Sequence, residues 1–173
     1  MNETVNTLLA RRSIRKYRHE QIKDEELDCI LKCGQYAMTA RGEQPWFFVA
    51  VQDDETKKQL SEMNAAVMGS HMDPYYGAPT VIIVLADSKA KEPVADASLA
   101  IGNMANAAAS LGIGSCWINR EKEMFETPDG KALLEKWNIS KDYIGVGALI
   151  LGYPEGDAPK AAPRKEGNIL IIK

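Results

Sequence analysis

The chain has 173 residues, of which 45% are hydrophobic and 26% charged, and its formal net charge is −3 at pH 7. This length predicts a single domain over residues 1–173. The acidic balance argues against a general nucleic-acid-binding role, and no apolar run approaches the roughly 20 residues that a membrane span needs. We therefore expect neither nucleic acid nor a membrane as a partner.

The cysteine content bears on the cellular compartment. Three cysteines are an odd number, which argues against a disulfide framework and favours a reducing cytoplasm. We also expect no secretory signal peptide, because Val5, Leu8 and Leu9 are too few for its apolar segment and arginines follow at once.

The N-terminal third predicts two helices and a strand. Residues 3–10 suit a short helix, and Asp24 has the position of the N-cap of a second helix. This second helix is expected to end near Ala40, before a glycine and a proline. Residues 46–51 are rich in aromatic and β-branched side chains, which predicts the first strand.

The rest of the chain alternates between predicted helices and strands. A third helix, capped by Asp53 or Asp54, is expected to run to about Val67, and Pro93 suits the first turn of a long helix. The remaining expected elements are strands at 81–85, 115–118 and 144–151, helices at 94–111 and 129–137, and a tail of strand composition at 169–172. This alternation predicts an α+β fold with α/β/α layers, in which helices pack on both faces of one sheet.

A basic segment follows the first predicted helix. Five cationic residues lie within eight positions of this acidic chain: Arg11, Arg12, Arg15, Lys16 and Arg18. Arginine forks match phosphate oxygens bidentately, and Ser13 adds a hydroxyl group. A phosphomonoester, with about −1.5 to −2 charges at pH 7, would hold several of these arginines together. The alternative is a solvated basic turn, since many charge clusters are only surface.

The helix expected at 94–111 is rich in alanine and also contains Gly102. A glycine inside a helix costs roughly 1 kcal/mol relative to alanine, so it indicates a close backbone contact. That contact would lie either in the core or at a subunit interface, and the sequence does not distinguish the two.

Other chemical motifs are disfavoured. The glycine pairs 112/114 and 145/147 lack the strand–loop–helix context of a dinucleotide fingerprint. Cys29 and Cys33 are interpreted as structural thiols, because cysteine is often simply buried. Cys116 would need a neighbouring base to act as a nucleophile, and only two histidines are available. No cluster has metal-ligand spacing, so no metal site is predicted.

Five short segments stand in a fixed order along nearly the whole chain. The first three are Arg11-Arg12-Ser13-Ile14-Arg15-Lys16-Tyr17, Gln44-Pro45-Trp46 and Tyr76-Gly77-Ala78-Pro79. The fourth is Ala107 to Trp117, an alanine-rich helix end followed by Leu-Gly-Ile-Gly-Ser-Cys-Trp, and the fifth is Leu151-Gly-Tyr-Pro154 with Pro163-Arg164 downstream. Together they resemble the nitroreductase family of flavoproteins, in particular its short, single-domain members. The resemblance implies a mixed sheet flanked by helices and a homodimer. In that dimer the C-terminal strand, at residues 168–173, is exchanged and adds to the partner's sheet.

The resemblance also implies FMN as the cofactor. The FMN phosphate and ribityl chain would be bound by Arg11, Arg12, Ser13 and Arg15, with Arg164 closing on the same phosphate. The backbone of residues 115–119 would lie along the isoalloxazine ring and tune its electronics. The remaining cofactor contacts implied are Cys116, Trp117, Ile118 and Asn119 from that stretch, and Thr39, Ala40, Gly42 and Gln44 from the partner subunit.

One segment departs from the family pattern Pro-Ser-x-x-Asn-x-Gln-Pro-Trp. Thr39 keeps a hydroxyl group, but Gly42 stands where the family often has asparagine, so we expect no side-chain contact to the flavin there. Arg41 and Glu43 are expected near the pocket, where they would influence substrate choice.

The function implied is FMN-dependent oxidoreduction, with hydride passing from NAD(P)H through flavin N5 to a nitroaromatic, quinone or similar acceptor. No protein acid or base is assigned, because the cofactor carries the chemistry. Alternatives within the same fold are a reductive dehalogenase-type enzyme, an enzyme that fragments flavin, and a flavin carrier or sensor without turnover. A phosphate-binding module without flavin is a further alternative.

Overall fold

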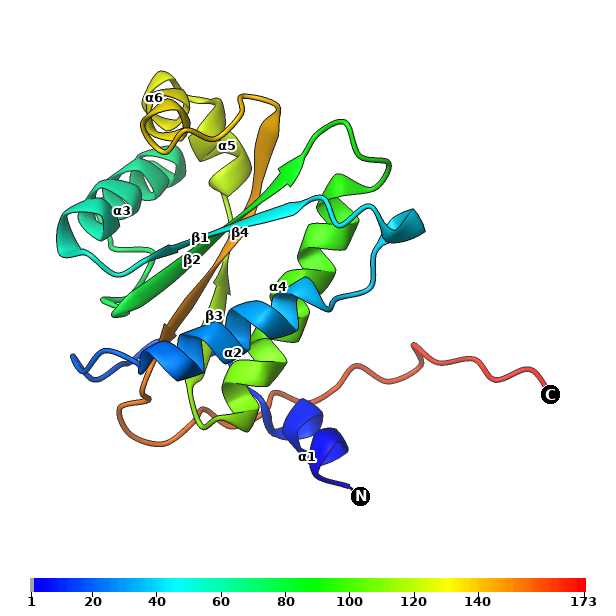
Figure 1. Ribbon diagram of the computed structural model, residues 1–173. Helices are drawn as coiled ribbons and strands as arrows, with labels where there is room; N and C mark the ends of the chain where they lie inside the picture. Colours follow the sequence, from blue (N-terminus) through cyan, green and yellow to red (C-terminus); the bar gives the residue numbers. More distant parts are fainter. Residues whose placement is uncertain (1) are drawn as a thin grey trace.

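The computed structural model describes residues 2–173, in which one sheet lies between two layers of helices (Figure 1). The strands are β1 (Trp46–Val51), β2 (Thr80–Asp87), β3 (Gly114–Ile118) and β4 (Tyr143–Gly152). The helices are α1 (Glu3–Ala10), α2 (Asp24–Gln35), α3 (Asp54–Met68), α4 (Pro93–Ser110), α5 (Glu121–Glu126) and α6 (Pro128–Lys136), with a short 3-10 turn η1 (Ala40–Gly42). Among the described residues, no helix is both long enough and apolar enough to cross a bilayer.

The sheet has the strand order β1-β2-β4-β3, and each neighbouring pair is antiparallel. Its register places Trp46 opposite Ala86, and Ala86 opposite Ile144. At the other end of β4, Leu151 lies opposite Ser115. The outer strands β1 and β3 therefore form the two edges of the sheet.

The core is divided by the sheet into two clusters. On one face Val81, Ile83 and Ile150 pack under the layer formed by α3, α5 and α6. On the other face Ile82 and Leu149 pack against α2 and α4. β2 is completely buried along 81–86, as expected for a strand covered on both sides.

Local capping fixes several helix boundaries. The Asn2 side chain accepts a hydrogen bond from the Val5 amide at 3.0 Å and so starts α1. Asp53 does the same for α3 through the Thr56 amide at 2.8 Å. Gly69 ends α3 in the left-handed conformation, with φ at 65°.

Residues 155–173 form an extended, solvent-exposed arm that leaves the domain (Figure 1). It contains no strand within the described chain. Ile169, Leu170, Ile171 and Ile172 expose 73–87% of their surface. Such an apolar run in water is an aggregation hazard unless another surface covers it.

The layered α+β class is confirmed, as are most of the predicted elements. Three expectations differ from the structure. The sheet is antiparallel rather than mixed within one chain. Among residues 2–173, the one parallel contact is an isolated bridge between Ser13 and Ser115. α2 begins after Lys23 and ends at Gln35, because the following residues turn away toward α4. The short helix α5 was not predicted, since six residues carry too little periodicity.

Candidate functional site

The basic segment is held against the edge strand β3. Ser13 forms a parallel bridge with Ser115, and the Ile14 amide donates to the Ser115 carbonyl at 2.9 Å. Further along, the Arg18 amide donates to the carbonyl of Tyr153 at 2.9 Å, just beyond β4. A loop that is polar in sequence is therefore fixed by backbone hydrogen bonds along one end of the sheet.

Two cavities border this segment. One of about 380 Å³ is lined by Arg11, Arg12 and Ser115, together with residues of α1 and the end of α4. Another of about 270 Å³ is lined by Ser13 and Arg15 and by the first residues of the arm. The predicted phosphate-binding residues thus lie at the walls of concave surfaces.

The arginines differ in how their guanidinium groups are used. Arg12 donates to the carbonyls of Leu9 and Arg11 at 2.8 and 2.6 Å, so it is tied to the C-terminal end of α1. Arg15 lies over the Tyr76 ring, 5.8 Å from its centroid. Within residues 2–173, no arginine of the segment pairs with a carboxylate. Carboxylates lie nearby, since Glu3 lines the first cavity and Glu155 and Asp157 line the second. Guanidinium groups without an ion-pair partner favour an anionic ligand.

A buried hydroxyl group lies in the same place. The Oγ of Ser115 is inaccessible to solvent and has no hydrogen-bond partner among the described residues. A buried hydroxyl without a partner is costly, and such groups often mark the place of a ligand or water. Ser115 is also one of the residues that line the cavity of Arg11 and Arg12.

Side chains alternate along the predicted ring-binding strand. Cys116 and Ile118 face the core under α3, α5 and α6, so their backbone rather than their side chains is available to a ligand. Trp117 points to the opposite face and is 56% exposed. It packs over Gly147, where an added Cβ would lie 2.6 Å from the indole Nε1. Asn119, at the end of the strand, is exposed.

The turn after β3 is held by a buried polar cluster that the sequence analysis did not identify. The Asn64 amide nitrogen donates to the Asn119 carbonyl at 2.9 Å and to Glu121 Oε1 at 3.1 Å. Arg120 Nε donates to Asn64 Oδ1 at 2.9 Å, and the Tyr75 hydroxyl lies 3.3 Å from the same Glu121 oxygen. Burial raises the pKa of Glu121 to about 8. No sequence motif indicates this cluster, because its members are far apart in sequence.

The turn at residues 39–44 is organised by another buried carboxylate. Asp96, near the start of α4, accepts hydrogen bonds from the Thr39 hydroxyl at 2.9 Å and from the Ala40 amide at 3.0 Å. The same hydroxyl accepts from the Gln44 amide at 3.0 Å. Arg41 and Gln44 have positive φ values of 56° and 48°, so the turn is tight. The Thr39 hydroxyl is thus engaged within the chain.

The two groups of predicted cofactor residues lie at opposite ends of the sheet. The 39–44 turn precedes Trp46, which lies opposite Ala86, and Ala86 in turn lies opposite Ile144 of β4. Ser13 instead bridges to Ser115, which lies opposite Leu151 of β4. Seven residues of β4 separate Ile144 from Leu151, which corresponds to roughly 23 Å at about 3.3 Å per residue. One chain therefore does not bring the two groups together.

Arg164 also lies apart from the basic segment. Its guanidinium donates to the carbonyl of Ala162, inside the exposed arm, at 2.7 Å. It lines neither of the two cavities beside Arg11 and Arg15. Contact of Arg164 with a phosphate held by these residues remains a prediction.

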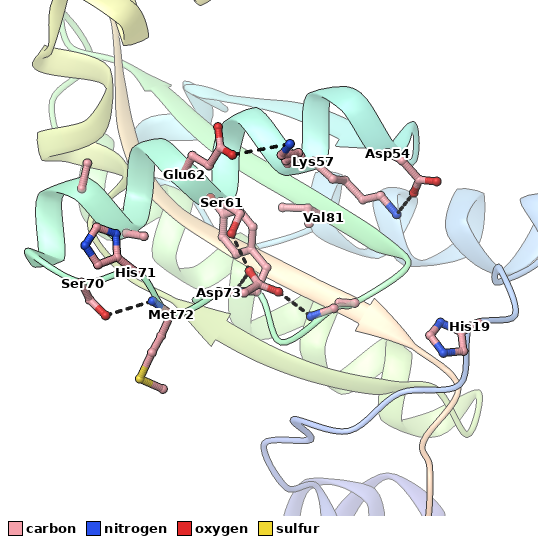
Figure 2. Close-up of a pocket in the computed structure, with 16 residues that line it drawn as sticks. His19, Asp54, Lys57, Ser61, Glu62, Ser70, His71, Met72, Asp73 and Val81 are labelled. Carbon is pink, nitrogen blue, oxygen red and sulfur yellow. Dashed lines mark hydrogen bonds and ion pairs between the residues drawn. The ribbon is translucent and has the colours of Figure 1, made fainter.

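A third cavity, of about 700 Å³, lies between α3 and the following loop (Figure 2). The polar groups that line this cavity form hydrogen bonds that hold the loop itself. Asp73 accepts from the Ser61 hydroxyl at 2.6 Å and from the Gly77 amide at 2.6 Å, while Lys57 donates to the Pro79 carbonyl at 3.1 Å. None of the predicted cofactor residues lines this cavity, so we assign it no role in flavin binding.

A sequence model of the nitroreductase family matches residues 8–153. The chain belongs to the nitroreductase family. A relative from Archaeoglobus fulgidus with the provisional name NADH dehydrogenase/NAD(P)H nitroreductase is 39% identical over 165 residues, which cover 91% of this chain and 88% of the relative. The FMN reductase (NADPH) of Bacillus subtilis is 30% identical over 161 residues, covering 75% and 61% of the two chains.

Solved nitroreductase structures agree with this membership. The nitroreductase of Bacteroides fragilis, determined with bound FMN, has 33% sequence identity and a TM-score of 0.92, and the match covers 100% of both chains. An FMN-dependent nitroreductase of Clostridium difficile has 26% identity and a TM-score of 0.87, covering 98% of this chain and 99% of the other. The family resemblance of the five sequence segments is thereby confirmed.

Proposed function

We propose that this chain is an FMN-dependent NAD(P)H oxidoreductase that passes reducing equivalents to a nitroaromatic, quinone or similar acceptor. One observation carries the proposal: a basic segment without carboxylate partners is fixed beside β3 at cavities suited to an anion. Relatives named as FMN reductases and nitroreductases support the same conclusion. When bound, FMN would supply hydride acceptance from NAD(P)H and hydride donation to the acceptor.

The described residues fit such a cofactor. The partner-free Ser115 hydroxyl and the unpaired guanidinium groups of Arg11 and Arg15 would bind the phosphate end. Ser13 and Arg12 would complete this set, with Arg164 reaching it through the arm. The backbone at Cys116, Trp117, Ile118 and Asn119 would lie along the ring, and the indole of Trp117 would limit access of water.

The homodimer is part of the proposal, because one chain separates the predicted cofactor residues. Thr39, Ala40, Gly42 and Gln44 of a second subunit would complete the site from its far side. Since Asp96 already holds the Thr39 hydroxyl, this turn would contribute mainly backbone groups. The free cysteines agree with a cytoplasmic location for the protein.

Three surface features support a second subunit. Leu8 and Leu9 on α1 and Leu99 on α4 expose 43–59% of their surface. No atom lies within 4 Å of a Cβ built at Gly102, so packing within the chain does not explain this glycine. A close helix contact between subunits would explain it. The unpaired edge of β1 would accept residues 168–173 of the partner as an added strand.

The test is an absorbance spectrum of the purified protein, followed by chromatography of the molecule released on denaturation. We expect flavin bands and FMN near one per subunit. The Arg12→Ala/Arg164→Ala double variant should lose FMN, whereas Arg18→Ala, whose exposed side chain lies outside the predicted set, should retain it. Full retention in the double variant would overturn the phosphate assignment.

Turnover separates the enzyme from the alternatives. Steady-state NAD(P)H oxidation that depends on an added quinone or nitroaromatic supports the oxidoreductase. Bound FMN without turnover would instead indicate a carrier or sensor. A colourless protein that ignores added FMN but binds another phosphoester would indicate a phosphate-binding module.

A further inference from the structure

Glu121 is a fully buried carboxyl group without an assigned role. Its Oε1 contacts the Asn64 amide nitrogen at 3.1 Å and the Tyr75 hydroxyl at 3.3 Å. Its Oε2 is inaccessible to solvent and has no hydrogen-bond partner among the described residues. An ionised carboxylate in this position would leave one charged oxygen unsatisfied, which is expensive in a low-dielectric interior.

The same cluster determines the path of the chain after β3. Asn64 bonds the Asn119 carbonyl through its amide nitrogen and Arg120 Nε through its oxygen, both at 2.9 Å. Arg120 has a φ of 85°, a left-handed conformation that a residue other than glycine adopts only when its surroundings enforce it. Two side-chain hydrogen bonds from one asparagine therefore stabilise a strained turn.

β4 fixes Glu121 from its other side. A Cβ built at Gly145 would lie 2.2 Å from the Glu121 carbonyl oxygen, so the backbones of α5 and β4 are in close contact. The start of α5 is therefore held in place against β4. The Glu121 side chain is linked to the neighbouring turn through Asn64, which contacts both Glu121 Oε1 and the Asn119 carbonyl, so its protonation state should influence that turn.

The surroundings favour the neutral acid at pH 7. Two titratable groups face the carboxyl: the Tyr75 hydroxyl from the 69–79 loop and the Arg120 guanidinium from its own turn. α3 presents the neutral Asn64, and β4 presents Gly145. Burial raises the pKa of Glu121 to about 8 and outweighs the opposing effects of its own backbone amide, the Tyr75 hydroxyl, the Arg120 charge and the Asn64 amide.

We propose that Glu121, as the neutral acid, acts with Asn64 as a positioning residue that holds the Asn119–Arg120 backbone in its flavin-binding conformation. Ionisation of Glu121 loosens this turn and weakens FMN binding. The inference rests on the proposed function, in which residues 115–119 lie along the flavin ring. It adds a protonation switch, built from α3 and α5, to the cofactor site.

The experiment measures FMN affinity by quenching of flavin fluorescence between pH 6 and pH 9.5. If FMN binds only the form with neutral Glu121, a pKa of about 8 predicts about tenfold weaker binding at pH 9 than at pH 7. Glu121→Gln, which cannot ionise, should bind FMN equally well at both values. The matched control Glu123→Gln, an exposed position on the same helix, should keep the wild-type pH dependence.

Amide hydrogen exchange of residues 117–123, with FMN present, gives a second readout, which reports on the turn itself rather than on FMN affinity. We expect the ratio of the wild-type to the Glu121→Gln exchange rates to be larger at pH 9 than at pH 7. Equal exchange at both values, or the same pH dependence of FMN affinity in wild type and Glu121→Gln, would overturn the inference. Failure to bind FMN at any pH would refute the proposed function separately, and the exchange comparison would still decide whether Glu121 controls the turn.

Discussion

The buried acid Glu121 makes a quantitative prediction about stability against pH. Burial raises its pKa from 4.5 to about 8 in the folded chain. Below about pH 4.5 both the folded and the unfolded states carry the proton, so Glu121 does not lower the free energy of unfolding there. As pH rises toward 8, the unfolded state releases the proton while the folded state retains it, and the free energy of unfolding falls.

The magnitude follows from the shift in pKa. Each pH unit in this window lowers the free energy of unfolding by about 1.4 kcal/mol, so the roughly 2.5 units up to pH 7 lower it by about 3 kcal/mol. Glutamine resembles the neutral acid in shape and cannot ionise. Glu121→Gln should therefore match wild type near pH 4.5 and exceed its stability by about 3 kcal/mol at pH 7, with little further gain above pH 8.

Urea unfolding of both proteins at pH 5, 6, 7 and 8 measures this difference. Protomer and FMN concentrations must be equal, because both shift the unfolding equilibrium. The contribution of other titrating groups cancels in the comparison. Parallel stability profiles for wild type and Glu121→Gln would show that Glu121 is ionised in the folded protein and would refute the reasoning.

Three further predictions follow from the packing. Asp96→Asn removes a charged acceptor from the 39–44 turn and should lower the free energy of unfolding by about 1–3 kcal/mol in urea titrations; an unchanged midpoint would contradict this. Gly147→Ala places a Cβ 2.6 Å from the Trp117 indole, so we expect about 1–3 kcal/mol of destabilisation and an altered tryptophan emission spectrum, and an identical spectrum would count against the packing. Deletion of residues 157–173 should convert the dimer to monomers in light scattering coupled to chromatography, and a truncated dimer would exclude the arm from assembly.

The sequence predicted those parts of the fold that depend on neighbouring residues. α1 was predicted at its observed bounds, 3–10, because its residues favour a short helix locally and the structure adds Asn2 as its N-cap. β2 was recognised from its continuous apolar composition. The strand directions were not, since antiparallel pairing depends on contacts between distant segments.

The candidate site was also predicted only in part from the sequence. The basic segment was visible as a charge cluster, and its place beside β3 could be inferred only from the family resemblance. The cluster around Glu121 was not visible, because Asn64 and Glu121 are 57 positions apart and each is an ordinary surface residue type. The role of Asp96 was hidden for the same reason, since its partner Thr39 is 57 positions away.

The exposed arm has a consequence for the order of folding. The central strand β4 ends at Gly152, so every strand of the sheet is paired before residues 155–173 are needed. The domain can therefore fold in a first-order reaction, whereas docking of the arm onto another subunit is second order. Refolding should show a fast phase independent of protein concentration and a slower phase that accelerates as concentration increases. During that interval each chain carries an unpaired apolar tail, which makes dilute refolding conditions the safer choice against aggregation.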